Sequence, residues 1–129
     1  LFYNPGSELA RGIYFVTFKD KDSSNDSASL LDRGDLFRMN LGLSKPRYRQ
    51  LFGDPPARPP AGGIVATGHD FTTIDKLLPH PVYAWMSWAC IISPRLATVD
   101  ELVPFFDDSY ALCRDKHASR TRPKRATAT

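Results

Sequence analysis

Leu36-Phe37-Arg38-Met39-Asn40-Leu41-Gly42-Leu43 is the stretch that decides the fold of this chain, because residue character alternates along it. In a β-strand, successive side chains point to opposite faces, so residues two apart share a face. One set is apolar throughout: Phe37, Met39, Leu41 and Leu43. The other set holds Arg38, Asn40 and Gly42. The stretch therefore predicts a strand with one face in the core and one polar face.

Neighbouring segments predict further strands on both sides of this one. Residues 12–19 are apolar on both alternating faces, which is typical of a central strand, and residues 19–29 form a polar loop. Residues 82–92 are strongly apolar and rich in aromatic side chains, which predicts another strand. A loop dense in proline and glycine occupies residues 54–68. Residues 74–78 predict a short helical turn.

Two helices are predicted. Ser44 can cap a short helix, with Pro46 in its first turn and Gly53 at its end. Thr98-Val99-Asp100-Glu101 has the form of a capping box and predicts a last helix from Thr98 to Lys116. Pro104 removes one backbone hydrogen bond, so it predicts a kink or a fresh helix start.

This order of elements predicts an α+β fold. Strands that follow one another in sequence favour antiparallel pairing, with helices segregated to one side. We therefore expect a two-layer sandwich, in which a mainly antiparallel sheet has its helices packed on one face.

Length and charge predict one domain and a tail. The 129 residues suffice for a single core, and we place the α+β domain at residues 1–116. Residues 117–129 carry four cations and no acid, so we expect a disordered basic tail there. Its charge exceeds the net charge of +3, which leaves the domain about −1. Leu1-Phe2-Tyr3 reads as a strand already begun, which predicts that an N-terminal part is missing.

Several function classes find no support in the composition. Cys90 and Cys113 are too few for a disulfide framework and sit in apolar patterns, so we expect reduced core thiols. No residues stand at zinc-like spacing, and no glycine-rich phosphate loop or nucleophile elbow occurs. No apolar run approaches a membrane span. We expect a cytoplasmic protein with no metal, no cofactor, no catalytic residue and no membrane partner.

Several motifs together resemble the bacterial family catalogued as domain of unknown function 6194. The resemblance covers about residues 1–116, and members usually carry a helix before the first strand, which is absent here. That family brings no established activity. The residues that carry the resemblance are Lys19-Asp20, Leu31-Asp32-Arg33, Phe37 to Gly42, Leu51-Phe52-Gly53, Asp70-Phe71-Thr72, Asp75, Leu77, Pro79-His80-Pro81-Val82-Tyr83, Trp88 and Pro94.

The end of the chain is more distantly similar to the MmcQ/YjbR group. In that group a strand with a tryptophan leads to a helix that ends in Ser-Tyr-x-Leu, here Ser109-Tyr110-Ala111-Leu112. The resemblance implies a two-layer α/β sandwich of the frataxin-like type. Some members of the group are labelled DNA-binding by fold analogy, which is a poor guide to function.

The candidate binding site follows from alternation. In the segment 82–92, Ala84, Met86, Trp88, Cys90 and Ile92 form the more uniformly apolar set and are expected to meet the helices. Tyr83 and Trp85 would then lie on the open face. His80 enters from a turn stiffened by two prolines. We predict ligand-binding residues Arg38, Asn40, His80, Tyr83 and Trp85. Alternatively, loop 54–68 covers this face.

Three polar features each leave two interpretations open. His80 is a general base or ligand contact, or it fixes a stiff turn by hydrogen bonding to backbone, and His69 with His80 is a weak metal hypothesis. Asp70, Thr72 and Asp75 bind a cation or cap a helix. The run Arg38, Lys45, Arg47 and Arg49 is an anion site or a solvated face.

The leading hypothesis is a non-enzymatic binding domain that recognises a small molecule, peptide or partner protein on its open sheet face. The alternative is a nucleic-acid-binding protein that uses the basic tail and the Arg38–Arg49 run. An enzyme with a site at His80 and Tyr83 is a third and weaker hypothesis.

Overall fold

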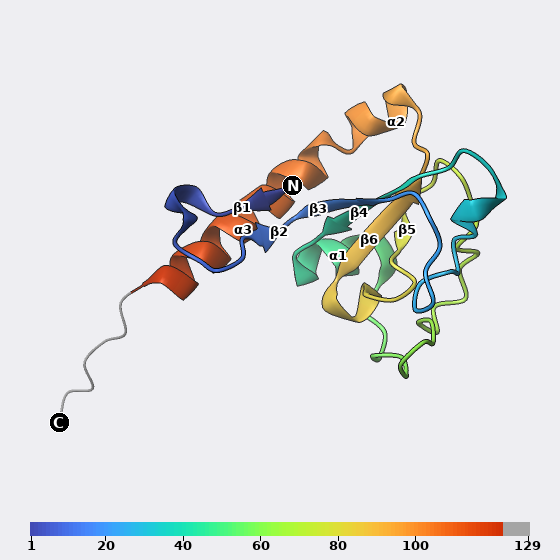
Figure 1. Cartoon of the computed structure of the whole chain (residues 1–129), viewed down its shortest axis with the longest axis horizontal. Coiled ribbons are helices and arrows are strands. Elements are labelled where there is room, and N and C mark those ends of the chain that lie inside the picture. Colours follow the sequence, from blue (N-terminus) through green and yellow to red (C-terminus); the bar gives the residue numbers. More distant parts are fainter. Residues whose placement is uncertain (123–129) are drawn as a thin grey trace.

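The computed structural model describes residues 1–122 of the chain, which contain two antiparallel sheets and three α-helices (Figure 1). Strands β1 (Phe2–Tyr3) and β2 (Ile13–Tyr14) form the small sheet. The large sheet contains β3 (Val16–Lys19), β4 (Arg38–Gly42), β5 (Leu78–Pro79) and β6 (Trp88–Ile92). The helices are α1 (Lys45–Phe52), α2 (Leu96–Glu101) and α3 (Val103–Thr121). Short 3-10 turns occupy Pro5–Ser7, Leu31–Arg33 and Ala84–Met86.

The large sheet is antiparallel throughout, in the order β3-β4-β6-β5. Strand β4 is central, and its partners are Val16 for Leu41 in β3 and Ala89 for Leu41 in β6. The short edge strand β5 ends in Pro79, at a position where a missing backbone donor costs no ladder bond. This arrangement confirms the predicted α+β class.

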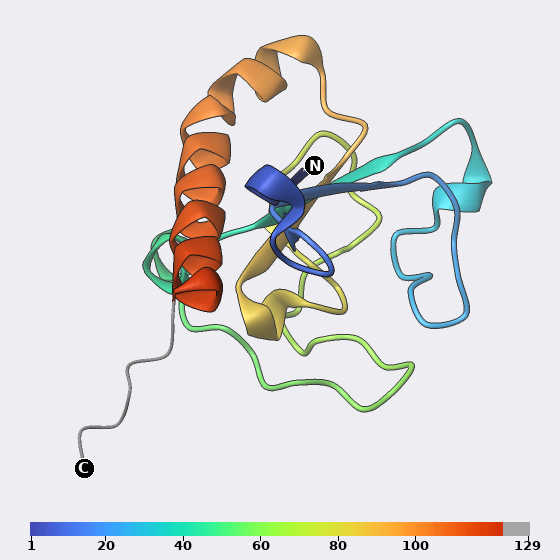
Figure 2. The ribbon, with the colours of Figure 1, turned by 60° about the vertical axis from the view of Figure 1, so that its left-hand side comes forward.

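The helices cover one face of the large sheet. Met39 and Leu41 of β4 are buried there with Ala89 and Ile91 of β6. Against them pack side chains of the helical segments: Leu51, Phe52, Leu102, Phe105 and Phe106. Figure 2 shows α3 running along this side of the sheet. Phe37 was expected in this core, but it is 39% exposed and contacts Phe18 instead.

The segment 82–92 is not one strand, which corrects the predicted faces. Ala84–Met86 forms a 3-10 turn, and Ser87 adopts a left-handed conformation with φ of 67° before β6 begins at Trp88. The alternation seen in the sequence therefore does not continue through the turn. Within β6, Ile92 pairs with Arg38, Cys90 with Asn40 and Trp88 with Gly42, so these three members of the set assigned to the helices lie on the Arg38 face. Ala84, a fourth member, is buried with Tyr48 of α1 instead.

Gly42 makes this placement of Trp88 possible. A Cβ at position 42 would lie 3.1 Å from Cζ2 of the Trp88 indole, which is tighter than ordinary van der Waals contact. The glycine in the alternating stretch therefore leaves room for an aromatic ring on the face away from the helices.

The helix predictions are partly confirmed. The hydroxyl of Ser44 accepts from the Arg47 amide at 3.2 Å and caps α1, and Gly53 ends it with φ of 84°. The Thr98 capping box is wrong, because α2 begins at Leu96 with no side-chain cap. Pro104 does mark a fresh start, since it lies in the first turn of α3.

Two further expectations differ from the structure. Residues 74–78 form no helical turn; Ile74 bridges to Ile92 instead. Helix α3 continues to Thr121, so part of the predicted disordered tail 117–129 is helical. His117 is buried there, and its ring centroid lies 5.1 Å from that of Tyr3. The rest of that tail, residues 123–129, lies outside the described residues.

One buried hydrogen bond joins α3 to the centre of the sheet. Ser109 is fully buried, and its hydroxyl donates to the carbonyl oxygen of Gly42. We expect Ser109→Ala to lower the free energy of unfolding by about 1–3 kcal/mol, because a buried group loses its partner. Ser119→Ala, at an exposed position of the same helix, is the matched control and should change it little. Urea denaturation of both variants measures the difference, and equal values would contradict the assigned role of Ser109.

Candidate functional site

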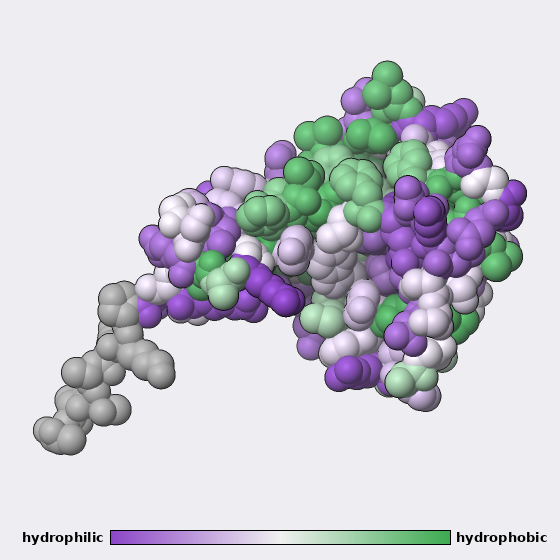
Figure 3. Space-filling model, viewed as in Figure 1, coloured by the Kyte–Doolittle hydropathy of each residue, from purple (hydrophilic) through white to green (hydrophobic). Residues whose placement is uncertain are grey.

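A cleft lies on the face of the large sheet that the helices leave uncovered. Its volume is about 530 Å³. Strands β3 and β4 supply its floor, and the segment 80–88 and the loop between β3 and β4 supply its walls. Figure 3 shows hydrophilic side chains gathered on the side of the molecule where that loop lies. The lining residues are Tyr14, Thr17, Phe18, Lys19, Ser23, Asn25, Asp26, Arg38, Asn40, His80, Val82, Tyr83, Met86 and Trp88.

Arg38 forms the floor of the cleft and is only 1% exposed. Its Nε donates to Oδ1 of Asn40 at 2.7 Å, and its Nη1 donates to Oδ1 of Asp26 at 2.8 Å and to the Ser29 hydroxyl at 3.0 Å. Its Nη2 donates to the other carboxylate oxygen of Asp26. A buried charge is tolerated only when it is paired and hydrogen-bonded, and Arg38 meets both conditions. Arg38 thus lies on the predicted face but beneath the loop.

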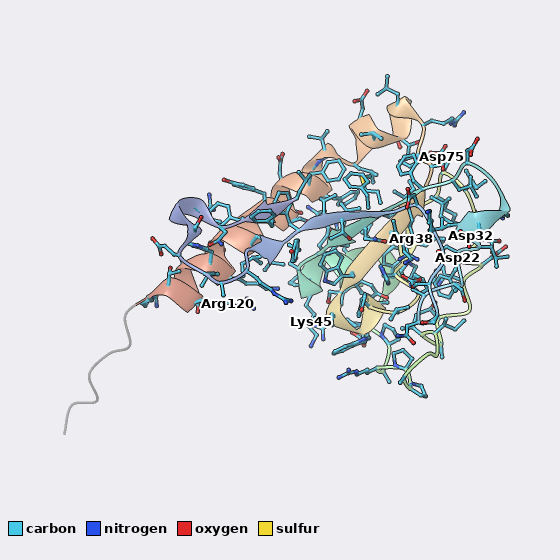
Figure 4. The ribbon with its side chains drawn as sticks, in the orientation of Figure 1. Asp22, Asp32, Arg38, Lys45, Asp75 and Arg120 are labelled. Atoms are coloured by element: carbon cyan, nitrogen blue, oxygen red, sulfur yellow. The ribbon has the colours of Figure 1, made fainter. Side chains whose placement is uncertain are left out.

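Asp26 is held in its ionised form by this contact. Burial favours the neutral acid, but the hydrogen bond and positive charge of Arg38 outweigh burial and lower the pKa of Asp26 below its usual value. The loop that carries Asp26 is also fixed by Asp22, earlier in the same loop, whose carboxylate accepts from the amide of Leu31 at 2.9 Å. Figure 4 shows Asp22 and Asp32, which lie next to each other and are joined by a hydrogen bond from the Asp22 amide to the Asp32 carboxylate at 3.1 Å.

His80 is 2% exposed and fixes the turn that follows it. Its Nδ1 accepts from the backbone amides of Val82 at 3.1 Å and Tyr83 at 3.0 Å. Burial and the nearby charge of Arg38 lower the pKa of His80 to about 3. The ring is therefore neutral near pH 7, and its geometry matches the structural role that the sequence left open.

The walls of the cleft are apolar and half-exposed. Tyr83 is 48% exposed, Met86 52% and Phe18 60%. The Tyr83 ring lies over the buried imidazole, with 5.0 Å between the centroids of the Tyr83 and His80 rings. The cleft thus combines an immobilised polar floor with aromatic surface that is open to solvent.

Four of the five predicted site residues line the cleft, and Trp85 does not. The lining includes Arg38, Asn40, His80 and Tyr83. Trp85 instead packs against the second buried cluster, which contains Tyr48, Val65, Phe71 and Ala84, and the Arg58 guanidinium lies 4.7 Å from its ring centroid. The 3-10 turn sends its side chain away from Arg38.

Loop 54–68 belongs to this second cluster as well. Val65 is buried in it, and its amide donates to the carbonyl of Pro81 at 2.9 Å. None of the residues that line the cleft comes from this loop. Loop 54–68 therefore does not cover the cleft, and the loop between β3 and β4 is the one that contacts Arg38.

Sequence reasoning missed Asp26, Ser29, Lys19 and Thr17 as partners or lining residues of the cleft. The hydroxyl of Thr17 accepts from the side-chain Nδ2 of Asn40 at 3.1 Å. Lys19 pairs with Arg38 in the β3–β4 register, which places both on one face. The β3–β4 pairing was a usable signal for these two, whereas Asp26 and Ser29 lie in a loop whose polar sequence gives no sign of burial.

The remaining candidates stand apart from the cleft. The ring of His69 contacts Phe52 and Phe71, away from His80. Asp70 accepts from the Thr72 amide at 3.0 Å in a local turn. The backbone of Asp75 has φ of 58°, and its carboxylate binds the backbone and side chain of Arg95, so neither acid caps a helix.

Within residues 1–122, no three His, Cys, Asp or Glu side chains gather in a way that could hold a metal ion. In the same range, no helix is both long and apolar enough to cross a membrane. Cys90 and Cys113 are both buried and free of disulfide bonds.

The Arg38–Arg49 run does not form one cationic surface. Arg38 is at the floor of the cleft, whereas Arg47 pairs with Asp108 and Arg49 with Asp54. The anion site that this run suggested is therefore not assembled from its members. Lys45 is exposed on α1.

Comparison with known proteins gives one match. A family model described as a family of unknown function (DUF6194) matches residues 1–122. No curated protein and no solved structure matches the chain significantly.

The buried neutral His80 predicts a pH dependence of stability. Because its pKa is lowered from 6.5 to about 3 in the folded state, the unfolded chain binds more protons between these values. Stability should therefore fall as pH drops from about 6.5 toward 3, with a slope of up to about 1.4 kcal/mol per pH unit from this residue. Asn at position 80 can still accept the amide bonds of the turn but cannot titrate.

Urea denaturation of the wild type and of His80→Asn at pH 7, 6, 5 and 4.5 measures this contribution. The loss of stability with falling pH should be smaller in the variant. Asp26, whose lowered pKa adds stability that is lost only below about pH 4, does not interfere in this range. Parallel curves for the two proteins would contradict a neutral, buried His80.

Proposed function

We propose that this chain, which belongs to the DUF6194 family because the family model spans residues 1–122, is a non-enzymatic domain that binds a small molecule in the cleft. One observation carries the proposal. A fully buried, hydrogen-bonded Arg38 forms the floor beneath aromatic walls that are about half-exposed. Small-molecule sites combine apolar walls with a few fixed polar groups in this way.

The size of the cleft supports a small molecule over a peptide or a partner protein. Its volume of about 530 Å³ lies in the range of about 300–1,000 Å³ that is typical of small-molecule sites. A partner protein would need roughly 800 Å² of surface on this chain, which is far more than the mouth of one cleft provides. Rigidity of the floor supports the same view, since fixed groups lose little entropy on binding.

The chemistry of the floor supports binding over catalysis. A general base needs a free lone pair within reach of substrate, and Nδ1 of His80 already accepts two backbone amides. The charge of Arg38 is matched by Asp26. Burial raises the pKa of the Cys90 thiol to about 12, so this thiol is not an activated nucleophile.

Nucleic-acid binding receives less support. Arg47 and Arg49 both have carboxylate partners, and Arg38 is buried. Binding to phosphates would weaken steeply with rising salt, whereas binding in the cleft would depend on salt far less. The cations beyond Arg122 lie outside the described residues.

Three finer expectations stay predictions: cytoplasmic location, bacterial origin and kinship with the MmcQ/YjbR group. For the last, Ser109 and Tyr110 have structural roles here. Ser109 bonds to Gly42, and the Tyr110 ring contacts Tyr3 and Phe15.

A fragment screen by protein-observed NMR tests the proposed function. We expect hits whose binding shifts the amide signals of residues 17–19, 38–40 and 80–88. Tyr83→Ala should weaken binding of these hits by roughly fivefold, since a stacked aromatic contact contributes on the order of 1 kcal/mol. The fold should change little, because Tyr83 is 48% exposed.

Tyr110→Ala is the matched control, because Tyr110 is 45% exposed and lies on α3 outside the cleft. This variant should bind the hits as the wild type does. A screen without any hit in the cleft, or hits that bind Tyr83→Ala and the wild type equally, would refute the proposed function.

A further inference from the structure

Two nitrogen atoms lie close together at the floor of the cleft, Nη2 of Arg38 and Nε2 of His80. A guanidinium has five N–H donors, and Arg38 gives four hydrogen bonds to Asn40, Asp26 and Ser29. The remaining donor, on Nη2, faces Nε2 of His80, with 3.2 Å between the two nitrogens. The state of that ring nitrogen decides what the contact is.

The contacts of Nδ1 assign the hydrogen of the His80 ring. Because Nδ1 accepts from the amides of Val82 and Tyr83, it carries no hydrogen. A neutral imidazole then carries its hydrogen on Nε2. Nη2 of Arg38 and Nε2 of His80 are therefore both donors, and the contact between them is not a hydrogen bond.

Unpaired donors at a buried position are costly, and an oxygen atom that accepts from both would remove the cost. His80 is 2% exposed and Arg38 is 1% exposed, and both line the cleft. With the ring hydrogen on Nε2, neither of these two N–H groups has an acceptor among residues 1–122. The geometry of the floor thus favours a ligand that presents an acceptor oxygen.

The charge of the cleft indicates which kind of oxygen. Three lining residues are ionised near pH 7: Lys19, Asp26 and Arg38. Asp26 neutralises Arg38, and the Lys19 ammonium donates to the Ser23 hydroxyl at 3.1 Å, with no carboxylate partner in residues 1–122. The lining therefore has an excess of one positive charge, which a singly charged anion would balance.

We propose that the cleft binds a small organic acid with an apolar or aromatic body, whose carboxylate accepts from Nη2 of Arg38 and Nε2 of His80. This inference rests on the proposed function and names its ligand class. The body of the acid contacts the walls formed by Tyr83, Met86 and Trp88. A phosphate dianion would fit less well, because it would leave the site with a negative charge in excess.

Three probes of similar size test the ligand class on the full chain at pH 7. Sodium benzoate carries one charge, benzamide is its neutral analogue, and phenyl phosphate carries nearly two. We expect benzoate to bind at least about tenfold more tightly than benzamide and more tightly than phenyl phosphate, with shifts at the cleft amides by NMR. This comparison requires no variant.

Variants locate the effect. His80→Asn keeps an acceptor for the turn but lacks Nε2–H, and Lys19→Gln removes the excess charge, so both should reduce the preference for benzoate. Lys45→Gln removes an exposed lysine of α1 outside the cleft and should preserve it. The ¹⁵N shifts of the His80 ring in the free protein should show a hydrogen on Nε2.

The outcomes separate the two proposals. Equal binding of benzoate and benzamide in the cleft, or tighter binding of phenyl phosphate, overturns the organic-acid class but keeps cleft binding. The same holds if neither benzoate nor benzamide binds while uncharged screen hits do. A ring hydrogen on Nδ1 also overturns it, because Nε2 would then accept from Arg38. If no probe and no screened fragment binds in the cleft, the proposed function itself is overturned.

Discussion

Burial of a guanidinium in the central strand is the constraint on which the rest of the structure depends. Arg38 lies in β4 on the face away from the helices, and it is 1% exposed. A charge removed from water destabilises the fold unless partners replace the lost hydration. Asn40 comes from the same strand, whereas Asp26 and Ser29 must be brought from the loop. The path of that loop over the sheet follows from this requirement.

The same constraint connects the fold to the site. The loop is fixed by Asp26, and the turn after β5 is fixed by His80, whose ring contacts two backbone amides and faces Arg38. The β3–β4 loop, strand β4 and the turn after β5 therefore all contact the guanidinium of Arg38. The floor is rigid before any ligand arrives, so little conformational entropy is lost on binding. Rigidity here is a by-product of satisfying a buried cation.

Local patterns in the sequence correctly predicted the features that neighbouring residues determine, namely the core face of a strand and the start of a helix. Alternation at Met39 and Leu41 identified the core face, and Ser44 identified the start of α1. Contacts at long range were not predictable: nothing in the polar loop marks Asp26 as the partner of a residue twelve positions later. Trp85 and Trp88 were assigned to the wrong sides because Ser87 has a left-handed backbone, which breaks the period of two. Helix α3 extends beyond its predicted end at Lys116, and His117 in this extension packs on Tyr3 of β1, a contact far apart in sequence.

Cys90 is a buried thiol whose chemical reactivity reports on opening of the large sheet. Its thiol lies on the Arg38 face, is 1% exposed and points to the carbonyl of Pro79 in the edge strand. Because only the thiolate reacts with alkylating reagents, and burial raises the pKa of this thiol to about 12, alkylation of Cys90 requires an opening of the fold that exposes the thiol to water. The alkylation rate of Cys90 therefore reports how often this part of the sheet opens.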